Sequence, residues 1–481
     1  MSQNTARERE EAPGPAGPQK RRSWGALRKL VLGLIGQLDP VKQRALTALL
    51  IRVAGAALAY LMQILLAQWM GLTQYGIFVG VWVWLLVLGG ISPLGLNISL
   101  IGHLATHHET GDLARWRGLL MTGIWVTLLS GTLIAVAGLT FVWTLPHLIA
   151  DAYLMPVWLC LFCVPLFALS EVNEGIARAH GWMNTALLPT YLLRPLFLIV
   201  GCFLAIQAGF EPNAVLAMTM AIGAALLTIA IQGLVLVVRL SEAGGSLRGE
   251  RIATPLVWVG AALPIVVAQT FELLTQNFDL IAVSYFLGAE ATGIYFAALK
   301  TIALLAFVNF AVGAASANRV ASLHAAGHKE EFHAHIQGAV NLAFWPTLIG
   351  AIAIVALSPF LLSLFGRDFT AHAYLTGILA FGFVAKGFVG PAELFLNVLG
   401  QQRACALVLM SAAALNIALN VVLIPWVGLA GAAIATAMSF VVLALALFVI
   451  ARRRLGIVLA PTVPWSSLAR IWPRLAKTRS A

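Results

Sequence analysis

Charged side chains are scarce in this chain. Asp, Glu, Lys and Arg make up only 10% of its 481 residues, whereas a soluble domain carries roughly 25%. Hydrophobic residues make up 60%. A core in water cannot hide this much apolar surface, so the composition excludes a water-soluble protein and indicates lipid as the solvent.

Signatures of catalysis, nucleotide binding and metal binding are missing as well. The chain contains no GxxxxGK followed by Ser or Thr, and no HExxH. Cysteines are few, lie inside apolar runs and have no second pair or nearby His that would complete a metal site: Cys160, Cys163, Cys202 and Cys405. Because every expected loop is also short, we expect no enzyme, no ATP-driven pump, no cofactor and no metal site.

Long apolar runs recur along the whole chain. They lack the strict alternation of a membrane barrel, and about 20 apolar residues suffice for a helix that crosses the hydrocarbon layer. The first six expected spans are 45–69, 77–101, 118–142, 153–176, 186–208 and 213–238. The second six are 256–286, 293–317, 337–364, 372–398, 404–425 and 428–450.

Lys and Arg gather on one side of these spans. Of the 30, 25 lie before the first span, after the last, or in loops on that same side, and only Arg367 lies in an opposite loop. Since positive loops face the cytoplasm, we expect both termini to be cytoplasmic. The net charge of +11 is then mostly a topology signal, and no nucleic-acid partner is expected.

One pattern appears twice. GLTQYGIF (71–78) and GAEATGIY (288–295) each read Gly, four residues, Gly, Ile and an aromatic residue, and they stand 217 positions apart. The loops 105–116 and 321–332 match loosely at nearly the same offset, as do the span ends 174–181 and 393–400. Two halves with six spans each have the same orientation, so they are parallel repeats, which usually enclose a cavity at their interface.

The expected fold is therefore an all-α polytopic membrane protein, with about twelve transmembrane helices in two parallel six-helix lobes around a central cavity. In the cytoplasmic tail 1–44, residues 24–38 have the pattern of an amphipathic helix on the membrane surface. The remaining parts are expected to be an N-terminal lobe, a cytoplasmic linker, a C-terminal lobe and a basic cytoplasmic tail: 45–240, 241–255, 256–450 and 451–481.

A family resemblance appears in FDLIAVSYFLGAEATGIYFAALK (278–300), an Asp, an apolar run, FLG, a turn and GIY before a helix of small residues. It resembles the seventh-span region of bacterial polysaccharide transporters, and QWMGLTQYGIFVGVW (68–82) repeats the pattern in the first half. These are the flippases for lipid-linked oligosaccharides within the multidrug/oligosaccharidyl-lipid/polysaccharide exporter superfamily. The similarity extends over roughly residues 45–450.

The resemblance implies a flippase that moves a polyprenyl-pyrophosphate-linked oligosaccharide across the bacterial cytoplasmic (inner) membrane by alternating access, for cell-surface or exopolysaccharide synthesis. Membrane lipid is an expected partner, and polysaccharide polymerase and export machinery are candidate partners. The alternative is a multidrug or cation antiporter of the same superfamily. A cation antiporter would favour carboxylates in its cavity, whereas four of the six deep charges here are basic.

Four basic residues stand inside the spans: Arg52, Arg194, Lys300 and Lys386. Ionisable groups at this depth are costly and usually face a cavity or a partner. An Arg donates two parallel hydrogen bonds to a phosphate. The four are therefore candidate substrate-binding residues, in a basic ladder along which an anion moves outward; Arg194 could instead snorkel towards the cytoplasmic interface.

A polar stripe runs along one face of the seventh span at positions i, i+3, i+7 and i+10: Gln269, Glu272, Gln276 and Asp279. We expect it to face the cavity and to contain an ion-coupling group. Since Arg52 corresponds to Gln269 in the repeat, Arg52 could lie opposite. Two interpretations remain open, one in which Arg52 forms an ion pair with Glu272 or Asp279 that ties the lobes together, and one in which these charges bind substrate.

Overall fold

The structure, a computed structural model, describes residues 40–242 and 248–462. The chain divides into two units, Met1–Leu50 and Ile51–Ala481. Of the first unit, only the opening turns of α2 (Pro40–Ile91) fall within the described residues. The expected surface helix at 24–38 lies outside them. The expected lobe boundaries and the cytoplasmic position of the termini stay predictions.

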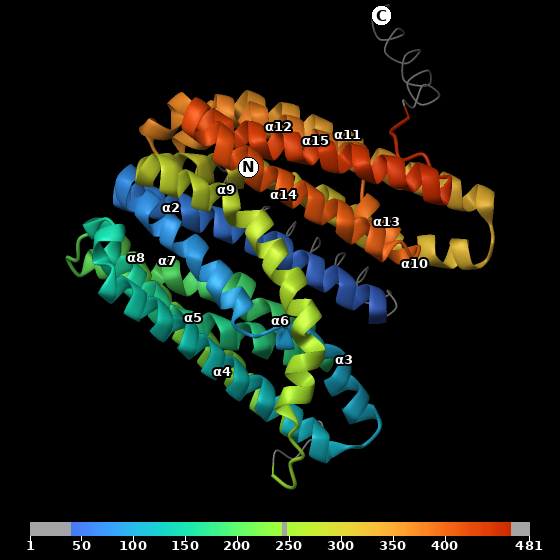
Figure 1. The fold of residues 1–481 in the computed structure, drawn as a ribbon, viewed down its shortest axis with the longest axis horizontal. Helices are drawn as coiled ribbons and strands as arrows, with labels where there is room; N and C mark the ends of the chain where they lie inside the picture. Colours follow the sequence, from blue (N-terminus) through green and yellow to red (C-terminus); the bar gives the residue numbers. More distant parts are fainter. Residues whose placement is uncertain (1–39, 243–247, 463–481) are drawn as a thin grey trace, which may run out of the picture. The chain divides into compact units, whose positions relative to one another are not determined.

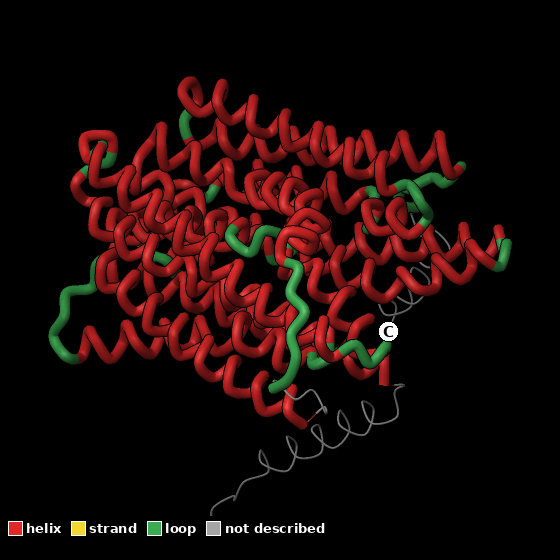
Figure 2. Tube along the Cα trace, turned by 60° about the horizontal axis from the view of Figure 1, so that its bottom comes forward, coloured by secondary structure: helices red, strands yellow, loops and turns green. Residues whose placement is uncertain are grey.

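Helices make up almost all of the described chain, and no strand occurs in it (Figure 2). After α2, the first half contains α3 (Leu96–Glu109), α4 (Leu113–Thr144), α5 (Asp151–Ala179), α6 (Met183–Leu188), the π-helical turn η2 (Pro189–Leu193), α7 (Arg194–Gln207) and α8 (Ala214–Glu242). The second half contains α9 (Pro255–Ala303), α10 (Ala306–Ala325), α11 (Lys329–Ser363), α12 (Tyr374–Phe388), α13 (Ala392–Val398), α14 (Gln402–Val427) and α15 (Leu429–Leu455). The all-α membrane fold expected from the sequence is confirmed.

In the described ranges 40–242 and 248–462, ten helical segments are long and apolar enough to cross a membrane. The two longest, Leu46–Glu109 and Pro255–Ala325, are 64 and 71 residues long, and each is interrupted by a glycine. Gly71 has φ 73° and ψ 172°, and Gly288 has φ 82° and ψ −170°, a backbone conformation that is essentially restricted to glycine. These two glycines open the two copies of the repeated pattern, so the chain turns where the repeat predicts. The count of twelve, which takes each long segment as two crossings, stays a prediction.

The two halves pack their helices in the same order. In the first half α4 packs on α3 and α5, and α8 packs on α5 and α7. The second half repeats this scheme, with α11 on α10 and α12, and α15 on α12 and α14 (Figure 1). Helix α9 also contacts α3 and α4 of the first half. The matching neighbours support two parallel repeats, with α9 connecting them.

Candidate functional site

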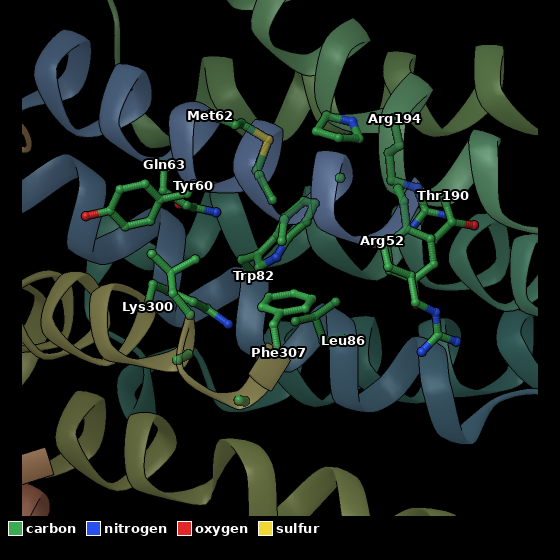
Figure 3. Close-up of a pocket in the computed structure, with 18 of the residues that line it drawn as sticks. Arg52, Tyr60, Met62, Gln63, Trp82, Leu86, Thr190, Arg194, Lys300 and Phe307 are labelled. Atoms are coloured by element: carbon green, nitrogen blue, oxygen red, sulfur yellow. The ribbon is translucent and has the colours of Figure 1, made fainter. Parts of the chain in front are cut away.

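A cavity of about 600 Å³ lies where the two halves meet. The first half contributes residues from α2, α5, η2 and α7 to its wall, and the second half contributes the end of α9 and the start of α10 (Figure 3). Both sections of α2 on either side of Gly71 take part, from Arg52 to Gln63 and again at Trp82 and Leu86. The cavity therefore occupies the position at which repeated transporter halves usually bind their substrate.

Three of the four basic residues singled out in the sequence line this cavity: Arg52, Arg194 and Lys300. No Asp or Glu stands among the described residues that line it. Glu171 and Glu174 act electrostatically on Arg194, and Asp279 acts on Lys300, but all three carboxylates lie outside the lining. Three cations in the wall itself favour an anionic occupant.

Arg52 is held by aromatic rings and not by a counter-ion. Its guanidinium carbon lies 5.7 Å from the centre of the Tyr191 ring and 5.0 Å from that of Phe310. Within the described ranges it forms no ion pair, so the pair with Glu272 or Asp279, one of the two interpretations that the sequence left open, is not present in this structure. Ring faces stabilise a cation without occupying its N–H groups, which leaves the guanidinium able to bind a phosphate.

Arg194 is buried and turned towards the protein interior. One terminal nitrogen donates to the Ser170 hydroxyl at 2.6 Å, and the guanidinium carbon lies 4.2 Å from the centre of the Phe167 ring. Its Nε has no hydrogen-bond partner among the described residues. The turn η2 widens the helix immediately before Arg194, a distortion that is frequent at functional sites. Arg194 therefore does not snorkel to the interface, the alternative that the sequence left open.

Lys300 extends from α9 into the cavity, with its Nζ 4.9 Å from the centre of the Phe296 ring. Lys386 is different. It lies on α12, outside the cavity lining, and its Nζ is 3.0 Å from Glu393 Oε1. In the first half, Glu174, which matches Glu393 in the repeat, pairs with Arg178. Lys386 is thus engaged within its own half.

The polar stripe of α9 does not line the cavity. Glu272 and Gln276 are exposed, and the Gln276 amide donates to the Glu272 carboxylate at 3.1 Å; Gln269 is half-buried. Asp279 is 5% exposed and accepts hydrogen bonds of 2.9 Å from the Tyr295 hydroxyl and from the Leu280 amide. The stripe therefore divides into an exposed part and one buried carboxylate.

Several lining residues were not predicted from the sequence, among them Tyr60, Gln63, Trp82, Thr190 and Tyr191. An aromatic side chain in a membrane helix has the same sequence signal whether it faces lipid or a cavity. Gln63 could have been found, because it stands eleven residues after Arg52 and thus on the same helical face.

The cavity is closed on the side of Gly71 and Gly288. The Tyr60 hydroxyl lies 2.9 Å from the Thr301 hydroxyl and so joins α2 to α9. Beyond it the fully buried Tyr75 donates to Gln63 at 3.1 Å and packs against the rings of Phe365 and Phe369. Aromatic packing and buried hydrogen bonds thus close this end of the cavity.

Comparison with known proteins agrees with this geometry. The sequence profile of the family described as "Polysaccharide biosynthesis protein" matches residues 41–317, more than half of the chain. The chain belongs to this family. The profile of a second family, MatE, matches residues 264–422 of this chain.

The solved structures share the fold at low sequence identity. An inward-facing multidrug resistance MATE family transporter of the MOP superfamily is 14% identical, with a TM-score of 0.68 over 85% of this chain and 98% of the other. The lipid II flippase MurJ in an inward closed conformation is 12% identical, with a TM-score of 0.64 over 85% of this chain and 87% of the other. The resemblance read from the sequence is confirmed, since the family member has the fold of the MOP superfamily.

A curated relative matches a shorter region. An uncharacterized membrane protein of Methanocaldococcus jannaschii is 25% identical over 192 residues. The match covers 37% of this chain and 36% of that protein. This chain therefore matches about a third of the length of the relative.

Proposed function

We propose that the protein is a flippase that carries a polyprenyl-pyrophosphate-linked oligosaccharide across the bacterial cytoplasmic membrane by alternating access. The observation that supports it most directly is the cavity with Arg52, Arg194 and Lys300 and no acidic lining residue among those described. A pyrophosphate cannot cross lipid without groups that replace its water, and cationic donors do so with charge-assisted hydrogen bonds.

Membership of the polysaccharide biosynthesis family agrees with this substrate. Sugar polymers of the cell surface are assembled on lipid carriers whose head group must change leaflets, and a large cavity between two repeats can shield such a head group. Polysaccharide polymerase and export machinery would then take the translocated product.

The runner-up function is a multidrug or cation antiporter, and the MATE fold supports it. A cationic drug needs a carboxylate or an electron-rich surface to replace its water. The cavity offers aromatic faces, but it also offers three positive charges that would repel such a drug. The charge of the cavity therefore favours the anionic lipid.

The distribution of Lys and Arg, with both termini in the cytoplasm, would place Gly71 and Gly288 on the outer side. The closed end of the cavity would then be the outer end, and this state would be inward-facing. An empty flippase in that state exposes its basic residues to the leaflet in which the lipid-linked sugar is made.

Asp279 is the best candidate for coupling transport to a proton or a sodium ion. It is a buried carboxylate whose hydrogen-bond partners are neutral: the Tyr295 hydroxyl, the Leu280 amide and, at 3.5 Å, the Thr436 hydroxyl. The charged group that acts on it is Lys300, with which it forms no ion pair in the described part of the chain. A carboxylate in such surroundings is costly to keep charged and is readily neutralised by a cation. Glu272 is exposed and, among the described residues, accepts a hydrogen bond only from the Gln276 amide, so it is not enclosed by protein groups in the way that Asp279 is.

The experiment is a translocation assay in proteoliposomes. A polyprenyl pyrophosphate with one radiolabelled hexose is incorporated, and the fraction of sugar open to an impermeant oxidant is followed with time. We expect rapid exposure of the inner-leaflet sugar with the wild-type protein and no gain over empty liposomes with Arg52→Ala. Equal rates in wild type, Arg52→Ala and empty liposomes would contradict the proposal.

A further inference from the structure

The two ends of the cavity differ in chemistry. Figure 3 shows Arg52, Thr190 and Arg194 at one end and Tyr60, Gln63 and Lys300 at the other, with Trp82 between them. Along α2, Arg52 and Gln63 precede Gly71 by 19 and 8 residues, which is about 29 and 12 Å at roughly 1.5 Å per residue. The two arginines thus lie far from the closed end, and Gln63 lies close to it.

Gln63 offers an unused donor at the closed end. Its side chain is 5% exposed, and its carbonyl oxygen accepts the hydrogen bond of Tyr75. Its amide nitrogen has no partner among the described residues, although the side chain lines the cavity. A buried amide that keeps a free donor next to an open space needs an acceptor there, because an unsatisfied donor costs stability.

Tyr60 offers the complementary acceptor. The Thr301 hydroxyl donates to the Ala297 carbonyl at 2.8 Å, so Tyr60 donates in its 2.9 Å contact with Thr301. The Tyr60 oxygen keeps acceptor capacity on the cavity side. A donor amide and an acceptor phenol at one end suit a ligand that both donates and accepts hydrogen bonds, as a sugar hydroxyl does.

Trp82 provides a rigid apolar face beside these groups. Its ring lies 5.5 Å from that of Phe78, and it stands edge-on to Phe167, also at 5.5 Å. The ring is half-buried, it lines the cavity, and its indole nitrogen has no hydrogen-bond partner in the described part of the chain. A fixed indole with a free N–H can cover the C–H face of a sugar ring and donate to a neighbouring hydroxyl.

We propose that Trp82, in the middle of the cavity, and Gln63 and Tyr60, at its closed end, form a sugar-binding subsite separate from the pyrophosphate-binding end at Arg52 and Arg194. The inference rests on the proposed function, since it assigns the two ends to the two parts of one head group. The pyrophosphate stays near the leaflet, where the arginines are, and the first sugar reaches inward to the indole. A polyprenyl tail would use neither the free amide of Gln63 nor the indole N–H, so an apolar tail is the poorer occupant.

The test compares two lipids that differ only in the sugar. Equilibrium binding of polyprenyl pyrophosphate, and of the same lipid with one hexose on its pyrophosphate, is measured with the full-length protein in detergent micelles. The variants are Trp82→Leu, which removes the aromatic face, and Trp82→Phe, which keeps a ring between Phe78 and Phe167. Trp125→Leu is the matched control, because Trp125 is 66% exposed and lies outside the cavity lining.

We expect Trp82→Leu to weaken binding of the hexose lipid by about threefold to tenfold and binding of the sugar-free lipid by less than twofold. Trp82→Phe should fall between wild type and Trp82→Leu for the hexose lipid, and Trp125→Leu should match wild type for both. Sugar-free binding by Trp82→Leu also shows that the variant is folded.

Two results would overturn the subsite. One is an equal loss for both lipids in Trp82→Leu, since Trp82 would then contact the pyrophosphate or the tail. The other is a wild-type protein that binds both lipids equally tightly. If the wild type binds neither lipid, the proposed function itself fails, and the subsite fails with it.

A second variant addresses Gln63 separately. Gln63→Glu keeps an acceptor for Tyr75 and the shape of the side chain, but replaces the free donor with a carboxylate oxygen. We expect a loss of binding that is larger for the hexose lipid than for the sugar-free lipid. A larger loss for the sugar-free lipid would contradict the assignment of Gln63 to the sugar.

Discussion

The Thr73 hydroxyl donates a hydrogen bond of 2.7 Å to the Glu290 carboxylate, and the two residues stand 217 positions apart. That separation equals the offset between the two copies of the repeated pattern. Thr73 and Glu290 are therefore equivalent positions of the two repeats, and they contact each other. Equivalent residues of two parallel repeats contact each other only close to the axis that relates them. The two glycine turns therefore close the cavity at the pseudo-twofold axis.

Gly76 is the closest point of this contact. A Cβ built on Gly76 would lie 1.9 Å from the Ala289 carbonyl oxygen. The backbones of Gly76 and Ala289 lie so close together that a methyl group does not fit between them. We therefore expect Gly76→Ala to prevent closure on this side and to shift the protein towards the opposite, outward-facing state. Gly223→Ala is the control, since a Cβ at Gly223 meets no atom within 4 Å.

The measurement is labelling of Ala59→Cys, a position in the cavity wall, with an impermeant thiol reagent; the four natural cysteines are buried. When Ala59→Cys is the only substitution, we expect labelling to be faster in inside-out than in right-side-out vesicles. When Gly76→Ala is added, we expect the reverse. An unchanged preference with Gly76→Ala would show that this contact does not set the state.

The repeat and the apolar runs were sufficient to predict the helical class, the two matching halves and the turns at Gly71 and Gly288. They were also sufficient to single out Arg52, Arg194 and Lys300, because a charge within an apolar span is conspicuous whatever its surroundings. The stripe on α9 was less predictable. Helical spacing fixes which residues share a face but not what that face meets, and Asp279 is buried against Tyr295 while Glu272 is exposed.

Arg52 is predicted to provide bidentate binding of the pyrophosphate. Arg52→Ala should weaken binding of polyprenyl pyrophosphate by roughly tenfold to a hundredfold, the loss expected for hydrogen bonds to a charged group worth about 1.5–3 kcal/mol. Arg52→Lys should recover only part of it, because an ammonium is a point charge and lacks the planar fork. The measurement is equilibrium binding of polyprenyl pyrophosphate in detergent micelles. If Arg52→Ala binds as tightly as the wild type, or Arg52→Lys binds no better than Arg52→Ala, Arg52 does not bind the pyrophosphate in this way.

Asp279 and Glu272 are predicted to differ in coupling. Transport in proteoliposomes is measured with and without imposed proton or sodium gradients. We expect Asp279→Asn to lose the dependence on the gradient, because a neutral amide cannot exchange a cation. Glu272→Gln, the control on the exposed part of the same helix, should keep it. If Asp279→Asn keeps the gradient dependence of the wild type, Asp279 does not couple transport to a cation and its role is structural.

His180 is predicted to make stability depend on pH. It lies between α5 and α6, its Nδ1 is 2.8 Å from the Ile176 carbonyl, and its ring stacks on Trp182 at 4.7 Å. Burial lowers the pKa of His180 below its ordinary value, the positive form of His108 lowers it further, and the bond to Ile176 opposes the shift. The folded state therefore holds fewer protons than the unfolded state between the lowered pKa and about 6.5.

The stability that neutral His180 contributes is complete above about pH 6.5 and is lost as the pH falls towards the lowered pKa. His180→Gln should therefore flatten the fall in thermal stability between about pH 7 and pH 5, measured as the midpoint of unfolding in detergent. His333→Gln, at an exposed histidine, is the control. An identical pH profile for wild type and His180→Gln would show that His180 does not titrate in this window.

The proposed function requires the cavity to bind an anion in preference to a cation or a neutral lipid. The direct measurement is competition at one protein sample between polyprenyl pyrophosphate, the uncharged polyprenol of the same length and a lipophilic quaternary ammonium cation. We expect that only the pyrophosphate displaces a labelled polyprenyl pyrophosphate at micromolar concentration, and that Arg52→Ala weakens this displacement. If the cation binds as tightly as the pyrophosphate, or the polyprenol displaces the label equally well, the basic cavity is not an anion site.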